Sequence, residues 1–233
     1  MEKEHAAALD EESTSFPTWI FESDFALPPK VCILAPGPRG RPHYAEIPDD
    51  YCVIAVNKAV LIPEVKADMW LINLYDQDWF EAANAAFDGV CILWREAQDS
   101  ERYSPAVEQR LSLVDGDKSY YFWIQYPGLD QYTMPFFSLS DLDHTIMSGG
   151  TVTGAALQLA YHFGAREVLL CGVDMSGDAY FDGSLSERGG HGEIWNSTKA
   201  VNFLIKQVLQ KKGIEVATLS PTKLDVPFWD RNR

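Results

Sequence analysis

One segment in the last third of the sequence gathers residues that could carry out acid–base chemistry. Asp174, Tyr180 and Asp182 follow an apolar run, and His191 stands a few residues further on, between glycines. Imidazole changes its charge near neutral pH, so His191 is a candidate general base that would deprotonate a hydroxyl group. A solvated loop histidine without a chemical role is the alternative.

Residues 35–40 form a turn that could contact a phosphate group. Gly37 and its neighbours would let backbone N–H groups approach an anion closely, and Arg39 and Arg41 could pair with its oxygens. The turn also holds Pro38, and it matches neither the Walker A pattern nor the GxGxxG pattern. An ordinary tight exit from a strand is therefore the alternative.

A second glycine-rich stretch opens the clearest helix of the chain. A helix start carries N–H groups that have no partner within the helix. Together with the hydroxyls of Ser148 and Thr151 and the flexible Gly149 and Gly150, these groups could bind an anion without any basic side chain. The alternative is a capped helix that packs closely on its neighbours.

Polar side chains also follow two of the earlier apolar runs. Asn57 comes after the second run, and Asn73 and Asp76 come at the end of the third. Amides and carboxylates at strand ends suit the hydroxyl groups of a ribose or the polar edge of a base, and the same holds for Asp174. Asn and Asp also form turns and cap helices, and that interpretation stays open for each of them.

Hydrophobic periodicity indicates which elements position these residues. One helix is expected at 151–163 and ends at Gly164. Another is expected at 196–212, with Asn196 or Ser197 as its cap and Gly213 as its stop. Strands are expected at short runs that are apolar on both faces, as in buried parallel sheets: 31–35, 52–56, 69–74, 90–94, 120–124, 168–171 and 216–219.

The alternation of strands and helices predicts an α/β fold with one doubly wound, Rossmann-like domain and a mostly parallel sheet. In such sheets ligands bind beyond the carboxyl ends of the strands. Residues 30–233 are expected to form this nucleotide-binding or nucleotide-sugar-binding domain, and residues 1–29 a partly ordered acidic arm. The less regular stretch 96–143 is expected to be a lid-like insertion.

Composition narrows the class of protein further. A chain of 233 residues suits one hydrophobic core, and 46% hydrophobic residues exclude a disordered protein. A net charge of -15 argues against nucleic-acid binding. The four cysteines are expected to be buried free thiols. The sequence has no apolar run of bilayer length and no signal-peptide pattern, so the cytoplasm is the expected location.

The order of these features resembles the bacterial sialyltransferases of glycosyltransferase family 42. It also resembles the wider Rossmann-like group that includes archaeal hydroxymethylpterin diphosphokinases. The similarity covers residues 30–95 and 145–219. Its most specific part runs through Ser148 and Gly149, an alanine-rich helix, residues 165–174, the Tyr180 loop, His191 and residues 199–204.

The resemblance implies a GT-A-like variant of the fold and assigns donor-binding roles by position. Gly37 and Pro38 would contact the phosphate or the sugar of the donor. Asn57 and Asn73 would contact the nucleotide sugar.

The resemblance also assigns the residues that would act during the transfer. Ser148 and Gly149 would bind the carboxylate or phosphate of the donor. Tyr180 would assist the departing phosphate, and His191 would deprotonate the acceptor hydroxyl.

Three functions are consistent with these residues. The first is transfer of sialic acid or a related sugar from a CMP- or other nucleotide-activated donor to a hydroxyl of a small glycan or other acceptor, with no metal required. The second is a pterin-type diphosphokinase that uses ATP, in which Asp76, Asp174 or Asp182 would hold magnesium. The third is a non-catalytic nucleotide-binding protein of the same fold. The sequence leaves open whether the chain forms a homo-oligomer.

Overall fold

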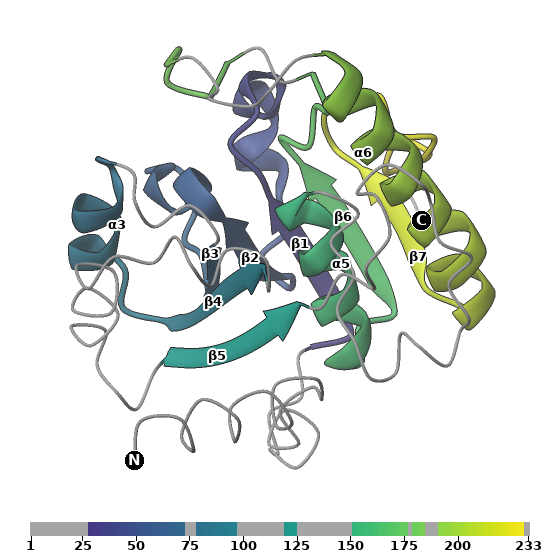
Figure 1. The fold of residues 1–233 in the computed structure, drawn as a ribbon, viewed down its shortest axis with the longest axis horizontal. Helices are drawn as coiled ribbons and strands as arrows, with labels where there is room; N and C mark the ends of the chain where they lie inside the picture. The colour runs from purple at the N-terminus through teal and green to yellow at the C-terminus, as the bar shows by residue number, and fades with distance from the viewer. Residues whose placement is uncertain are drawn as a thin grey trace, which may run out of the picture.

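Seven apolar segments form one sheet in which every pair of neighbouring strands is parallel (Figure 1). The computed structural model describes residues 28–72, 78–96, 119–124, 151–176, 179–184 and 191–230. The predicted doubly wound α/β fold and all seven predicted strands are confirmed. The strands are β1 (Lys30–Leu34), β2 (Cys52–Val56), β3 (Met69–Ile72), β4 (Val90–Glu96), β5 (Ser119–Ile124), β6 (Glu167–Cys171) and β7 (Glu215–Thr218).

The strand order β5-β4-β3-β2-β1-β6-β7 contains one point at which the chain reverses its direction across the sheet. Strands β2 to β5 add successively on one side of β1, and β6 and β7 then add on the other side. Leu34 of β1 pairs in register with Cys171 of β6, so the two strands end side by side. Ligands of open α/β sheets bind at the carboxyl ends of the strands at such a switch point.

Two long helices cover one face of the sheet. The helix α5 (Val152–His162) lies in front of β1 and β6 in Figure 1, and α6 (His191–Phe203) lies beside β7. The apolar residues of α5 and of the segment that follows α6 form one buried cluster with alternate strand residues such as Val31 and Ile33. A fully buried aliphatic side chain contributes about 1.5–3 kcal/mol, so this cluster fixes both helices on the sheet.

The prediction for α5 is confirmed at both ends. The Thr151 side chain accepts a hydrogen bond from the backbone N–H of Thr153 at 3.2 Å, which makes Thr151 the N-cap. Gly164 follows the helix with φ of 90°, a conformation that stops a helix and that glycine adopts without strain.

The predicted start of the second helix is wrong. The helix α6 begins at His191, five positions before the predicted Asn196 cap, and then continues as a π-helix (Leu204–Leu209) and a 3-10 turn (Gln210–Lys212). The glycines around His191 suggested a loop, but one glycine in the first helical turn is tolerated. The predicted end is confirmed, because Gly213 stops the helix in the left-handed conformation.

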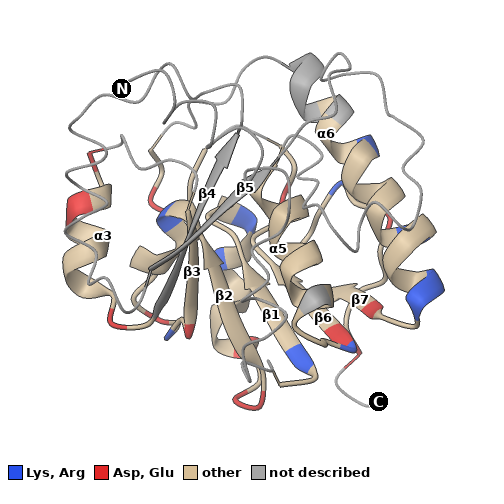
Figure 2. Cartoon of the chain, turned by 60° about the horizontal axis from the view of Figure 1, so that its bottom comes forward, with Lys and Arg blue, Asp and Glu red and all other residues tan. Residues whose placement is uncertain are grey.

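Short helices cover the other face. Cys32 and Leu34 point away from α5 and form a second cluster with residues of two 3-10 helices, η1 (Pro38–Glu46) and η2 (Asn57–Leu61). The helix α3 (Phe80–Ala86) packs over β3, where the ring of Trp70 lies 5.7 Å from that of Phe80. Charged residues lie mainly at strand ends, loops and helix surfaces around an apolar sheet interior (Figure 2).

Two predictions about composition can be compared with the described residues. Three of the four cysteines, Cys32, Cys52 and Cys171, are buried free thiols as predicted. Among the described segments, no helix has the length and apolar character needed to cross a membrane. The predicted arm at 1–29, apart from its last two residues, and most of the predicted insertion at 96–143 lie outside the described residues.

Candidate functional site

A pocket opens at the carboxyl end of the sheet, where the chain reverses direction. Its cavity volume is about 70 Å³, and the pocket is open to solvent at its mouth. Its walls come from the ends of β1, β2 and β6, from the start of α5 and from the loop after β6. Its described lining residues are Ala35, Pro36, Gly37, Val56, Asn57, Val152, Thr153, Gly172, Val173, Asp174, Met175, Ser176, Ala179 and Tyr180.

Backbone strain is concentrated at this pocket. In the part of the chain that the structure describes, the non-glycine residues with positive φ are Asn57 (48°) and Met175 (53°), and both line the pocket. A hydrogen bond fixes the Asn57 backbone, because the indole N–H of buried Trp70 donates to the Asn57 carbonyl oxygen at 2.8 Å. Strained backbone that is held by surrounding contacts is typical of ligand sites.

The turn at 35–40 has no backbone N–H group left for a ligand. The N–H of Ala35 donates to the Cys171 carbonyl oxygen at 2.8 Å, and that of Gly37 donates to the Gly172 carbonyl oxygen at 3.0 Å. The two prolines of the turn have no N–H. The two remaining donors are also used, since Arg39 N–H donates to the Asp174 carboxylate at 3.1 Å and Gly40 N–H to the Gly37 carbonyl oxygen at 3.1 Å.

Because these N–H groups already have partners, the prediction that the turn binds phosphate through them is corrected. Three of the donors bind the end of β6 and the loop after it, and the fourth, of Gly40, binds within the turn. The side chains of Arg39 and Arg41 are exposed on η1, and neither residue is among the described lining of the pocket. Pro38 also lies outside that lining. Gly37 faces the pocket and can contact a ligand only through its Cα and its carbonyl group.

Glycine is required at position 37 by the closeness of β6. A Cβ atom on Gly37 would lie 2.3 Å from the Gly172 carbonyl oxygen and 2.7 Å from Cγ of Asp174. Asp174 is 4% exposed, and its carboxylate accepts the N–H of Arg39, so it joins the β1 and β6 loops while lining the pocket. The β1–β6 side of the pocket therefore carries acceptor groups and apolar surface.

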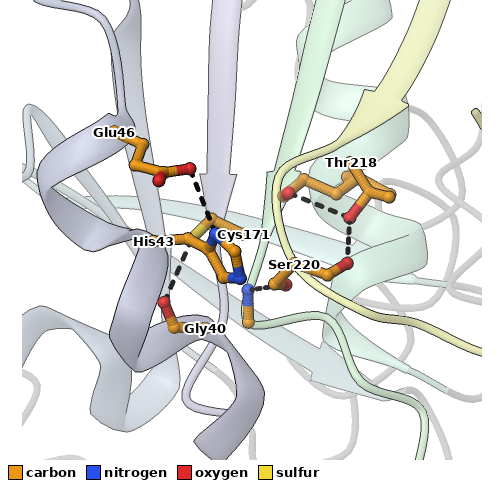
Figure 3. Close-up of polar contacts among 8 residues, drawn as sticks. Gly40, His43, Glu46, Cys171, Thr218 and Ser220 are labelled. Carbon is orange, nitrogen blue, oxygen red and sulfur yellow. Dashed lines mark hydrogen bonds and ion pairs between the residues drawn. The ribbon is translucent and has the colours of Figure 1, made fainter. Parts of the chain in front are cut away.

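Contacts beneath the pocket hold the end of β6 in place (Figure 3). Gly172 has φ of 71°, and its N–H donates to the hydroxyl of fully buried Ser220 at 2.9 Å. The Thr218 hydroxyl in turn donates to the Ser220 carbonyl oxygen at 2.7 Å. The Cys171 thiol lies 3.9 Å from the Gly40 carbonyl oxygen. Burial, with the nearby Asp174 carboxylate, raises the pKa of Cys171 to about 12, so this thiol stays protonated and is not a nucleophile.

The start of α5 forms the side of the pocket that favours negative charge. Val152 and Thr153 line the pocket, and the positive end of the helix dipole lies at this first turn. Thr151 is 2% exposed and uses its hydroxyl to cap Thr153 N–H, so its observed role is structural. The predicted neighbours Ser148, Gly149 and Gly150 lie outside the described residues.

Tyr180 lines the pocket from the loop after β6. Its backbone N–H donates to the Ser184 carbonyl oxygen at 2.8 Å, and the next N–H, of Phe181, donates to the Pro36 carbonyl oxygen at 2.7 Å. The ammonium group of Lys58 lies 5.3 Å from the centre of the Tyr180 ring and 2.6 Å from the carboxylate of Asp182.

The Asp182 carboxylate is engaged by this contact and by Ser184. Burial acts to raise its pKa, but hydrogen bonds from Lys58 and Ser184 outweigh that effect and lower the pKa to about 2. Within the described segments, no group of three or more His, Cys, Asp or Glu side chains is placed to hold a metal ion. The diphosphokinase hypothesis named Asp182 as a magnesium ligand, and its carboxylate is paired with Lys58 instead.

The structure brings four of the predicted site residues together in one pocket: Gly37, Asn57, Asp174 and Tyr180. Asn73 and Asp76 lie outside the described residues, and His191 is described only as the first residue of α6. Sequence reasoning missed Thr153, Ser176 and Lys58. A lysine directly after Asn57 at a strand end was a visible signal, whereas the two hydroxyl residues look like ordinary helix and loop positions.

The fold and the place of the pocket define a Rossmann-like α/β protein with a pocket at the switch point of its sheet. Among solved structures, a variant of the sialyltransferase CST-II in complex with CMP has a TM-score of 0.50 and 16% identity, over 82% of each chain. The monofunctional alpha-2,3-sialyltransferase Cst-I from Campylobacter jejuni has a TM-score of 0.50 and 14% identity, over 85% of this chain and 77% of that one. At these identities the likeness shows a shared fold. No family model matches the chain, and no curated protein matches it in sequence.

Proposed function

We propose that this chain is a glycosyltransferase that transfers sialic acid or a related sugar from a CMP-activated donor to an acceptor hydroxyl. One observation carries the proposal: Gly37, Asn57 and Asp174, predicted for donor binding, and Tyr180, predicted to assist the departing phosphate, line one pocket at the switch point of the sheet. The fold is shared with a sialyltransferase solved in complex with CMP, which makes a cytidine nucleotide the first ligand to test.

The polarity of the pocket favours one orientation of the nucleotide. The β1–β6 side offers the Asp174 carboxylate and a turn without available N–H donors, so it would repel a phosphate and accept hydrogen bonds from hydroxyl or amino groups. The start of α5 has the opposite polarity. We therefore expect the phosphate near Val152 and Thr153, and the ribose or base near Asp174.

The transfer itself would be a single displacement with inversion. The acceptor oxygen forms a bond to the anomeric carbon while the bond from that carbon to the phosphate oxygen of CMP breaks. The proton of the acceptor passes to the imidazole of His191, and the Tyr180 hydroxyl donates a hydrogen bond to the departing phosphate. The role of His191 rests on the family resemblance, and that of Tyr180 also on its position at the pocket.

Titration calorimetry with CMP, ATP and GTP, each with and without magnesium, tests the nucleotide and the cofactor. The proposal expects CMP to bind without magnesium, together with slow hydrolysis of CMP-sialic acid. Binding of ATP that requires magnesium, in the absence of CMP binding, would favour the diphosphokinase. Binding of CMP without turnover in the presence of candidate glycan acceptors would favour the non-catalytic protein.

Two variants separate binding from chemistry. Asn57→Gly keeps the positive φ at low cost and removes the side chain, so we expect CMP affinity to fall about tenfold with little change in fold. His191→Ala is expected to lower turnover about 100-fold or more while CMP still binds. His43→Ala is the matched control, because His43 lies on η1 beside Glu46 (Figure 3) and outside the described lining of the pocket. An unchanged rate in His191→Ala would remove the assignment of the base.

The remaining expectations follow from the same proposal. The acceptor is a hydroxyl on a small glycan or another molecule, and nucleic acid is not a partner. Neither a metal nor another cofactor is required. A cytoplasmic location stays a prediction from the sequence.

A further inference from the structure

We infer that Lys58 is a positioning residue that holds Tyr180 at the rim of the pocket. Lys58 follows Asn57 directly, at the start of η2 and at the carboxyl end of β2. Its consequence for catalysis rests on the proposed function, whereas its consequence for the loop at 179–184 does not.

Three contacts of one ammonium group carry the inference. The Nζ atom of Lys58 lies 2.6 Å from the Asp182 carboxylate, 2.8 Å from the Ser184 hydroxyl and 5.3 Å from the centre of the Tyr180 ring. Its side chain is only 13% exposed, although Asp182 is 37% exposed. A lysine that is held on three sides restricts the segment it touches, because each partner fixes a different direction.

Several other contacts also hold this loop, and the contacts of Lys58 add to them. The N–H of Phe181 binds the Pro36 carbonyl oxygen at the end of β1, and the Phe181 ring packs against the cluster under η1 and η2. The hydrogen bonds between Tyr180 and Ser184 and between Gly183 and Tyr180 lie within the loop. Lys58 adds a polar contact to the loop from the residue that follows Asn57 after β2.

The pairing with Asp182 decides which role Lys58 can have. A carboxylate at 2.6 Å neutralises the ammonium charge locally, so Lys58 is not an unpaired cation that could bind a phosphate. It acts through the Tyr180 ring, over whose face a cation is attracted. In the proposed transfer this places the Tyr180 hydroxyl, and the loss of Lys58 should lower kcat more than it raises KM.

Hydrogen exchange without any ligand tests the positioning itself. In Lys58→Met we expect amides of residues 179–184 to exchange about fivefold faster than in the parent chain, the factor that a partly exposed ion pair can supply. Lys58→Arg retains the positive charge, and its guanidinium group can also lie over an aromatic ring, so it should restore most of the protection. Lys30→Met is the matched control, since Lys30 contacts Asp50 and the Tyr51 ring in the same way at the other end of the sheet. Equal exchange at 179–184 in all four proteins would overturn the inference.

Asp182→Asn removes the charge that pairs with Lys58 but keeps a side-chain oxygen for the N–H and hydroxyl of Ser184, which lie 3.0 and 2.7 Å from the Asp182 carboxylate. It gives the result independently if Lys58→Met does not fold. Accelerated exchange at 179–184 in this variant supports the inference, and exchange at the parent rate contradicts it.

Kinetics of CMP-sialic acid hydrolysis test the catalytic consequence. We expect kcat to fall about fivefold in Lys58→Met, with KM within about twofold of the parent and with recovery in Lys58→Arg. If the parent chain neither binds CMP nor hydrolyses the donor, the proposed function fails, and the exchange data alone decide the role of Lys58. If the parent is active and both readouts are unchanged in Lys58→Met, the inference about Lys58 fails while the proposed function stands.

Discussion

The two ends of the sheet carry the same trio of residues in different surroundings. At the amino end, Lys30 pairs with Asp50 at 2.8 Å and lies 5.5 Å from the centre of the Tyr51 ring. At the carboxyl end, Lys58 pairs with Asp182 at 2.6 Å and lies 5.3 Å from the Tyr180 ring. The lysine side chain is 42% exposed in the first trio and 13% exposed in the second.

The difference extends beyond the trios. At the amino end, both partners of the ion pair, Lys30 and Asp50, are exposed to water. At the carboxyl end, the buried polar residues Asn57 and Asp174 line a pocket, and the ends of β1 and β6 are joined by backbone hydrogen bonds. The same residue types therefore have different effects according to their exposure. An exposed ion pair contributes little to stability, whereas a more enclosed pair can fix a loop.

The largest expected effect comes from adding one methyl group at each end. Gly37→Ala places a Cβ 2.3 Å from a backbone oxygen at the carboxyl end, and we expect a loss of about 3 kcal/mol or more in the free energy of unfolding. Gly213→Ala, before β7 at the amino end, meets open space and is strained only by its φ of 78°, which costs about 1–2 kcal/mol. Urea denaturation measures both. Equal losses would mean that the β1–β6 contact is not tight.

Removal of a hydroxyl at each end should have the next largest effect. Ser220→Ala leaves the buried N–H of Gly172 without its acceptor, and we expect a loss of about 2 kcal/mol. Tyr51→Phe removes the hydrogen bond to Glu167, whose partly exposed carboxylate can turn to water, and we expect a loss of about 1 kcal/mol. Thermal unfolding compares the two variants, and a larger loss in Tyr51→Phe would contradict the comparison.

Double-mutant cycles measure the two ion pairs directly. The cycle of Lys58→Met with Asp182→Asn should give a coupling of up to about 1 kcal/mol, reduced by the exposure of Asp182. The cycle of Lys30→Met with Asp50→Asn should give no resolvable coupling, because both side chains are well exposed. Similar couplings in the two cycles would show that enclosure at the pocket adds nothing.

The smallest expected effect is the response to acid. The pKa of Asp182 is lowered to about 2 in the folded chain, below the value of about 3.9 of a free aspartate. Its stabilising contribution is therefore complete above about pH 4 and is lost as the pH falls toward about 2. We expect Asp182→Asn to flatten the decline in stability over this interval more than Asp50→Asn does. Unfolding curves measured between these pH values test the difference.

Much of the fold could be predicted because its signals are local. Each strand is a short apolar run bounded by turn residues, and α5 carries its own cap and its own glycine stop. The start of α6 was missed because the glycines around His191 looked like a loop. The correct grouping of Gly37, Asn57, Asp174 and Tyr180 followed from one rule about the ends of parallel strands.

What could not be predicted depends on contacts between distant segments. The use of the N–H groups of the 35–40 turn depends on Gly172 and Asp174, and periodicity cannot indicate such pairing. The same applies to Lys58, whose role is set by Asp182 and Tyr180 on a loop much later in the chain. Sequence patterns identified the residues at the pocket, but they did not identify which donors and acceptors remain available there.

The engaged donors of the 35–40 turn have a consequence for the design of ligands for this pocket. A compound that places a carbonyl or sulfonyl oxygen against this turn would strip that oxygen of water and find no N–H group in return. Methylene, hydroxyl or amine substituents meet no such cost, because the wall offers carbon atoms, carbonyl oxygens and the carboxylate of Asp174. Affinity should thus be gained on this side by donors and hydrocarbon, and acceptor-rich groups belong near the first turn of α5.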